Sequence, residues 1–428
     1  MNAERLEISR LFHRFGFGPK PGEFSVALKA GVPATREKFL TPSSKTVIAD
    51  PVLTDLGPFP FVKTQARVDF NAAMQKQRRD LTLWWLDRMV LADDVLNERM
   101  TWFWHGHWAT SIGKVEYALP MFMQNKTLRD NALGNFTQQA RFMIMDGALQ
   151  YWLDGGDNVA GSPNENLSRE FMELFTLGVN RYAETDVKTV SRALTGYRVV
   201  RSSGKVTFNA KAHDGQSLSF LGTTGSYDAV STSDFLVSRD DCAQFIAERL
   251  WFRFISDTVA LPDQNTIKSA FATRDISSAV KQAISGGYLA DPQYSMVKSP
   301  VEWFVAVCRA LSLTPSKLKK PEFIISYLDK LGQVPFVPPN VGGWPSGEFW
   351  LTASSAQYRL QFAQALIQQA DMSFLKSVQP SLRYAFLADH LAVPEFSLRS
   401  QRALRDASSD PARVFLLAVS TPEYIVNA

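Results

Sequence analysis

The sequence predicts a mostly α protein, a multi-helix globular bundle that carries one small β insert. Apolar residues recur three and four positions apart over long stretches, which is the period of an amphipathic helix. Short alternating segments with glycine turns gather around residues 196–234. Hydrophobic residues make up 45% and charged residues 21% of the 428 residues, which excludes a disordered or fibrous protein and allows a large core.

Residues 1–195 are expected to form an N-terminal helical lobe. Leu81 and Trp85 are four positions apart and share one helical face. Asp94 can cap a following helix that runs through Trp104. This lobe also contains the polar segments in which we look for chemistry.

Residues 196–234 are expected to form a β-hairpin or meander, and residues 235–428 a C-terminal helical lobe. Ser299, Pro300 and Glu302 together mark a helix start, because the serine can cap the helix, proline suits its first position and the glutamate can accept the serine amide. We expect the three segments to pack as one compact unit.

Charge and targeting signals narrow the possible partners and location. The formal net charge is +4 without a dense basic run, which indicates neither nucleic acid nor an anionic membrane as a partner. No apolar stretch approaches the ~20 residues that span a bilayer, and the N-terminus lacks a secretory signal, so a cytoplasmic location is expected. Cys242 and Cys308 are expected to be buried, inert thiols.

Three stretches together resemble the bacterial family called domain of unknown function 1800. They are TWFWHGHWATS at 101–111, the segment 161–197 that begins GSPNENLSREFMELF, and PPNVGGWPSG at 338–347. Weaker similarity is found in HRFGFGP from His13, in KSPVEW from Lys298 and in STPEY at 420–424. The resemblance extends over essentially the whole chain, but it implies no established activity. Many relatives carry export signals, which this chain does not.

The first candidate site is the His-x-His pair, His105 and His107. On a continuing helix, residues two apart point about 200° from one another and cannot share an ion, whereas in a turn they lie on one side. Gly106 favours the turn. Neutral imidazoles in such a pair are common ligands of zinc, manganese or iron. The alternative is that both histidines hydrogen-bond the backbone inside a tryptophan-rich core.

The second candidate site is a polar stripe on a helix expected to begin at Ser162, with Glu165 in the capping box. Glu170 and Glu173 are three positions apart on this helix and can chelate a cation together or act as an acid–base pair. Arg169 lies beside them, and these three are the candidate catalytic residues. The alternative is a solvated face held by salt bridges.

A further carboxylate, Asp186, lies in the first turn of the next helix, which Thr185 can cap. If the two helices are antiparallel, Asp186 converges with Glu170 and Glu173. The candidate metal ligands are therefore His105, His107, Glu170, Glu173 and Asp186.

Three functions follow from these residues. The first is a metal-assisted enzyme, a hydrolase that uses zinc, manganese or iron to activate water on a small-molecule or polymer substrate. The second is a non-catalytic scaffold that recognises a protein partner through the polar stripe and the PPNVGGWP loop. The third is a metal-free polysaccharide hydrolase with Glu170 and Glu173 as acid and base, although residues on one helix turn are too close to flank a scissile bond.

Two other features are interpreted as structural. The loop at 338–345 is expected to cross the fold with Trp344 as its anchor. His13 and His390 have no polar neighbours in the sequence and are not candidates.

Overall fold

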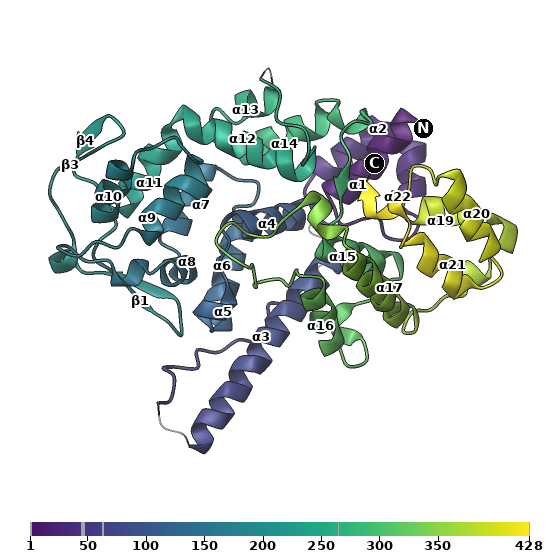
Figure 1. Cartoon of the computed structure of the whole chain (residues 1–428), viewed down its shortest axis with the longest axis horizontal. Coiled ribbons are helices and arrows are strands. Elements are labelled where there is room, and N and C mark those ends of the chain that lie inside the picture. The colour runs from purple at the N-terminus through teal and green to yellow at the C-terminus, as the bar shows by residue number, and fades with distance from the viewer. Residues whose placement is uncertain (1, 44–47, 62–63, 264, 428) are drawn as a thin grey trace.

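Helices dominate the chain, as predicted, and the computed structural model describes residues 2–43, 48–61, 64–263 and 265–427 (Figure 1). The helices up to the β insert are α1 (Ala3–Arg14), α2 (Glu23–Leu40), α3 (Gln65–Leu91), α4 (Val95–His107), α5 (Ile112–Val115), α6 (Ala118–Asp130), α7 (Phe136–Ile144), α8 (Gly147–Trp152), α9 (Asn166–Glu170), the π-helix η2 (Phe171–Thr176) and α10 (Glu184–Ala193). Those after it are α11 (Ala229–Ser238), α12 (Asp240–Phe254), α13 (Thr266–Ala270), α14 (Ile276–Ser285), α15 (Pro300–Ala310), α16 (Glu322–Lys330), α17 (Ala353–Ile367), α18 (Ser373–Lys376), α19 (Arg383–His390), α20 (Leu398–Asp406), α21 (Pro411–Ala418) and α22 (Pro422–Ile425).

The strands form short antiparallel pairs. They are β1 (Tyr197–Val200) with β2 (Lys205–Phe208), β3 (Leu218–Phe220) with β4 (Thr223–Gly225), and β5 (Met296–Val297) with β6 (Val426–Asn427). The predicted β insert is confirmed, but it ends before residue 234. Asp228 caps α11 by accepting the Ser231 amide at 2.8 Å, so the helix begins at Ala229.

The hydrophobic interior is divided into two large cores. The first core is built from α1, α2 and the helices from α7 to α14, and it includes Phe136 and Trp251. The second core is built from α3, α5, α6 and the helices from α15 onward, and it includes Trp85 and Trp303. Each core therefore contains residues from both 1–195 and 235–428, so these two predicted lobes are not separate packing units.

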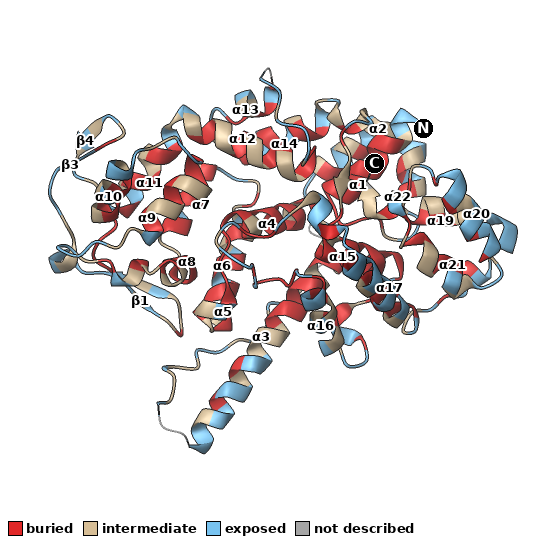
Figure 2. Ribbon diagram, viewed as in Figure 1, coloured by how far each residue is buried: buried red, intermediate tan, exposed pale blue. Residues whose placement is uncertain are grey.

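Helix α4 lies between the two cores. Phe103 and Trp104 belong to the first core, whereas Trp102 belongs to the second. Figure 2 shows that α4 is buried along nearly its whole length, while the first half of α3 extends from the molecule with much of its surface exposed. A helix buried on every side must be apolar or have its polar groups satisfied inside the protein.

No helix of the described chain is long and apolar enough to cross a membrane. Both cysteines are buried and free, as predicted, and burial raises the pKa of the Cys242 thiol to about 12.

The close approach of α8 to the β1–β2 turn gives a test of this packing. A Cβ at Gly147 would lie 1.9 Å from the carbonyl oxygen of Gly204, so one backbone must move. We expect Gly147→Ala to lower the free energy of unfolding by about 2–3 kcal/mol, the typical cost of overpacking. Gly215→Ala is the matched control, because a Cβ there meets nothing and the backbone is not left-handed. Equal urea midpoints for the two variants would contradict this contact.

Candidate functional site

The predicted turn at His105 and His107 is wrong, because α4 continues through Gly106 to His107. The amide of Trp108 donates to the carbonyl of Trp104 at 2.8 Å, which completes the last helical turn. The helix is favoured here because both of its sides are packed against hydrophobic cores. As expected for residues two apart on a helix, the two histidines face different surroundings.

His105 lies in the second core. Its Nε2 accepts a hydrogen bond from the Phe336 amide at 3.1 Å, and its ring contacts Trp85, Trp102 and Trp344. Burial lowers the pKa of His105 to about 3. The imidazole is therefore neutral near pH 7, and its acceptor nitrogen is already occupied.

His107 lies in the first core. Its Nε2 is 3.0 Å from the carbonyl oxygen of Phe175, which requires the proton on this nitrogen. Burial, with a smaller contribution from the positive charge of Arg249, lowers the pKa of His107 to about 3. Both histidines thus hydrogen-bond the backbone in an aromatic core, which is the structural alternative considered from the sequence.

The polar stripe begins later than predicted. Helix α9 begins at Asn166, so Ser162 does not cap it, and Glu165 forms an ion pair with Arg169 at 3.0 Å instead of a capping box. Arg169 also forms an ion pair with Glu184 at 2.5 Å, which matches the salt-bridged alternative.

Glu170 and Glu173 remain neighbours across the change from α9 to the π-helix η2. The Tyr182 hydroxyl donates to Glu173, whereas no hydrogen bond to Glu170 is found in the described chain. Burial, followed by the negative charge of Glu173, raises the pKa of Glu170.

Asp186 has a structural role at the start of α10. Its carboxylate accepts the amides of Ala183 at 2.8 Å and of Leu221 at 2.9 Å, and α10 begins at Glu184, so Thr185 is not the cap. Among the described residues, no three His, Cys, Asp or Glu side chains are grouped so that they could hold a metal ion. The five predicted ligands do not meet at one point, and metal binding stays a prediction.

Charged groups do converge in a cavity between the two cores, which we call the junction cavity. Its polar lining comes from seven segments and comprises His13 and Arg14 of α1, Arg99 of α4, Arg253 of α12, Asp257, Lys298, Ser299 and Glu302 at the start of α15, Gln333, and Trp344 with Ser346. It consists of two adjoining spaces, each with a free volume of about 30 Å³.

More basic than acidic side chains line the junction cavity. Four basic side chains face it, and they are Arg14, Arg99, Arg253 and Lys298. Only two carboxylates, Asp257 and Glu302, oppose them. Arg99 forms an ion pair with Glu302, and the two charges neutralise each other.

The other cations of the junction cavity donate to backbone carbonyls. Arg253 donates to Trp344 at 3.0 Å, and Lys298 donates to Tyr424 at 2.5 Å while its Nζ lies 3.7 Å from the centre of the Tyr424 ring. Carbonyl oxygens orient these side chains without adding a negative charge, so the basic side chains of the lining still outnumber its carboxylates.

Several polar atoms at the junction cavity are buried and have no hydrogen-bond partner in the described part of the chain. They include the Ser299 hydroxyl, Asp257 Oδ2, the Trp344 indole nitrogen and His13 Nδ1. Buried polar groups are usually paired, and an unpaired one is favoured at a position where water or a ligand completes it.

The environment separates the proton affinities of the two carboxylates. Burial raises the pKa of Asp257, in spite of Arg14 and Arg253 nearby. For Glu302 burial acts in the same direction, but Arg99 outweighs it and holds the pKa below its usual value. Asp257 is therefore the carboxylate that takes up a proton more readily. Burial also lowers the pKa of Lys298 well below its usual range.

The sequence does not predict this site. His13 has no polar neighbours in the sequence, yet it lines the junction cavity near Lys298. A usable signal was present, because HRFGFGP, KSPVEW and PPNVGGWPSG each supply lining residues. Arg253 and Asp257 lie outside these stretches, and only the fold brings them there.

The loop at 338–347 joins this cavity to α4. Trp344 is buried and stacks on Trp102 at 5.2 Å, which confirms its role as an anchor. Gly343 has a φ of +84°, and a Cβ there would lie 2.5 Å from the carbonyl oxygen of Gly106. Gly343 and Trp344 of the loop predicted as a scaffold surface are therefore buried, whereas Pro339, Asn340 and Pro345 are exposed.

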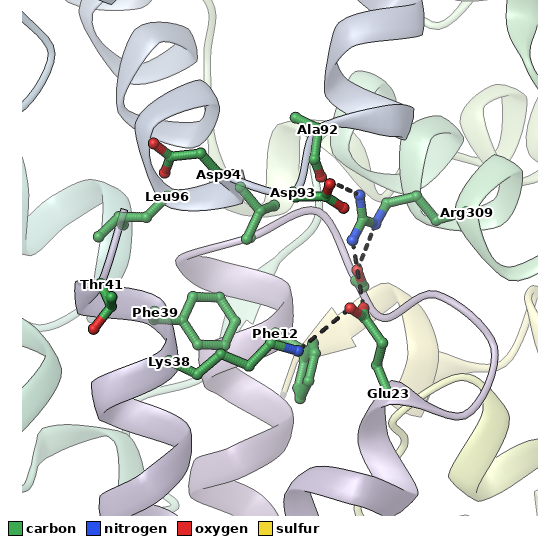
Figure 3. A pocket seen from close by; sticks show the side chains of 13 residues that line it. Phe12, Glu23, Lys38, Phe39, Thr41, Ala92, Asp93, Asp94, Leu96 and Arg309 are labelled. Carbon is green, nitrogen blue, oxygen red and sulfur yellow. Dashed lines mark hydrogen bonds and ion pairs between the residues drawn. The ribbon is translucent and has the colours of Figure 1, made fainter. Parts of the chain in front are cut away.

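A second pocket, between α1, α2 and the start of α4, has its charges paired internally (Figure 3). Arg309 donates to the Gly18 carbonyl at 2.8 Å and lies 3.5 Å from Glu23, which also pairs with Lys38 at 3.3 Å. The charges of this second pocket are therefore accounted for by contacts within the protein. The junction cavity is the stronger candidate for a functional site.

Comparison with known proteins gives a family and no named relative. A family model described as "Protein of unknown function (DUF1800)" matches residues 10–426. No curated protein and no solved structure matches the chain.

The two buried histidines predict a loss of stability in acid. Their folded-state pKa of about 3 lies below the unfolded value near 6.5, so their contribution is fully present above pH 6.5 and is lost as the pH falls towards 3. When the pH is lowered from 7 to 5, protonation of each histidine in the unfolded state should lower the free energy of unfolding by about 2 kcal/mol.

Urea titrations of wild type and His105→Gln at pH 7, 6 and 5 test whether the buried histidines cause this loss of stability in acid. The variant should be less stable at pH 7, and the difference should shrink by about 2 kcal/mol by pH 5. Parallel pH profiles would show that His105 is not excluded from protonation in the folded protein.

Proposed function

Since this chain belongs to the DUF1800 family, whose description names no reaction, we propose its function from the junction cavity: the protein binds the carboxylate of a small-molecule substrate there. The observation that carries the proposal is the set of basic side chains that line the cavity. Arg253 and Lys298 face it and form no ion pair with a carboxylate among the described residues, while Arg99 and Glu302 neutralise each other. A bound anion would favour the charged forms of these basic side chains.

The size of the junction cavity favours a carboxylate. A water molecule needs about 10–15 Å³ of such space, so each compartment of about 30 Å³ holds about two. The two oxygens of a carboxylate need similar room. The Ser299 hydroxyl and the Trp344 indole, which have no partner among the described residues, would donate to those oxygens.

Asp257 is the proposed acid–base group of the junction cavity. Its raised pKa and its buried Oδ2 make it the group that exchanges a proton with the bound acid. A bound anion would raise this pKa further by charge repulsion, so binding should be accompanied by proton uptake.

Calorimetric titration with sodium acetate at pH 7 and low ionic strength tests this proposal. We expect one acetate per chain, and Arg253→Gln should weaken binding about tenfold through loss of a charge-assisted hydrogen bond. Uptake of a proton, measured from titrations in buffers of different ionisation enthalpy, should disappear in Asp257→Asn.

Arg141→Gln is the matched control, because Arg141 forms an ion pair with Asp234 away from the cavity. Sodium phosphate should bind more weakly than acetate because it is larger. Absence of acetate binding to folded protein, or equal losses in the control, would end the proposal.

A metal-assisted hydrolase remains a second proposal, with Glu170 and Glu173 as its ligands. The raised pKa of Glu170, caused by burial and then by Glu173, is the observation in its favour, because a divalent cation would relieve the repulsion. His105 and His107 do not share in such a site, since they face different cores.

Elemental analysis of untagged protein purified without chelator separates these possibilities. If a metal is bound, we expect a Glu170→Gln, Glu173→Gln double variant to lose it and a His105→Gln, His107→Gln double variant to retain it, with folding checked by circular dichroism. Loss of metal in both double variants would support the ligand set predicted from the sequence, and loss in the histidine variant alone would contradict a site at Glu170 and Glu173.

A further inference from the structure

Arg249 on α12 is a cation without a partner. Its guanidinium makes no hydrogen bond or ion pair to the described residues, and its Nε is buried. The neighbouring charge is also positive, because Arg253 follows one helical turn later. The adjacent imidazole of His107 is neutral.

Burial and a neighbouring positive charge both act on Arg249. Burial first, and then the charge of Arg253, lower the pKa of Arg249 to about 10. The residue is partly exposed, and its Nε is buried without a partner among the described residues. A negative group bound in the groove would pair with this guanidinium.

Arg249 lines a groove whose other walls are mainly apolar. The groove lies between α12 and residues 255–261, and Phe245, Trp251, Phe252, Val259 and Leu261 form its apolar surface. Its free volume is about 390 Å³, within the range of small-molecule sites. The junction cavity, in contrast, has room only for a small polar group.

Two carboxylates also border the groove. Glu248 is paired with Arg181 at 3.1 Å, so its charge is compensated. Asp257 stands, together with Phe252, in the wall shared with the junction cavity. Arg249 is therefore a cation of the groove lining that has no ion-pair partner among the described residues.

We propose that this groove is a binding site for an amphipathic carboxylic acid, with the carboxylate on Arg249 and an apolar chain along Phe245, Phe252 and Val259. Charge complementarity selects the head group, and burial of apolar surface selects the chain. The inference does not depend on acetate binding in the junction cavity, since it rests on Arg249 and on a separate space.

Calorimetric titration with sodium octanoate, below its micelle concentration, tests this inference. We expect octanoate to bind at least tenfold more tightly than acetate. Arg249→Gln should weaken octanoate binding at least tenfold and leave the weaker binding of 1-octanol unchanged. Arg253→Gln should affect acetate more than octanoate, which separates this site from the junction cavity.

Two further variants control for folding and for the apolar wall. Arg249→Gln removes an unpaired cation, so its melting temperature should not fall below that of wild type. Val259→Asp places a charge at a partly exposed wall residue and should abolish octanoate binding while Arg249 is retained. Octanoate that binds no better than acetate, or that binds equally well to Arg249→Gln, would overturn the inference.

Discussion

The position of α4 between two hydrophobic cores is the constraint on which the rest of the structure depends. His105 accepts the amide of Phe336 from one side, and His107 donates to the carbonyl of Phe175 on the other. His105 must be neutral because its Nε2 accepts a hydrogen bond, and burial keeps both imidazoles neutral near pH 7. The His-x-His segment, which the sequence suggests as a metal-ligand pair, therefore connects the three stretches that resemble the family.

Local sequence patterns predict the presence of helices well, but they predict only some of the residues at which helices begin. The pattern Ser-Pro-x-Glu occurs twice, and at Ser299 the Glu302 carboxylate accepts the serine amide at 3.0 Å as predicted. At Ser162 the same pattern fails, because the Asn164 amide donates instead to the side chain of Asn158 at 2.9 Å. A competing hydrogen bond from a residue outside the pattern decided the outcome, and such a bond depends on the fold.

The candidate site could be predicted only in part for a related reason. HRFGFGP and KSPVEW are recognisable in the sequence. Their polar residues line one cavity only because the fold places α1 and α15 beside α4. Arg253 and Asp257 belong to no recognisable motif. Their importance comes from the unequal pairing of charges in an enclosed space, which is a property of distances and not of residue spacing.

The short pairing of β5 with β6 has a consequence for how the molecule is assembled. Lys298 directly follows β5, and its Nζ is bound by the carbonyl and the ring of Tyr424, 126 positions later in the chain. The cationic wall of the junction cavity is therefore incomplete while the chain emerges from the ribosome. Ligand binding there reports that distant parts of the chain have docked, so a ligand would favour the fully assembled protein over its folding intermediates.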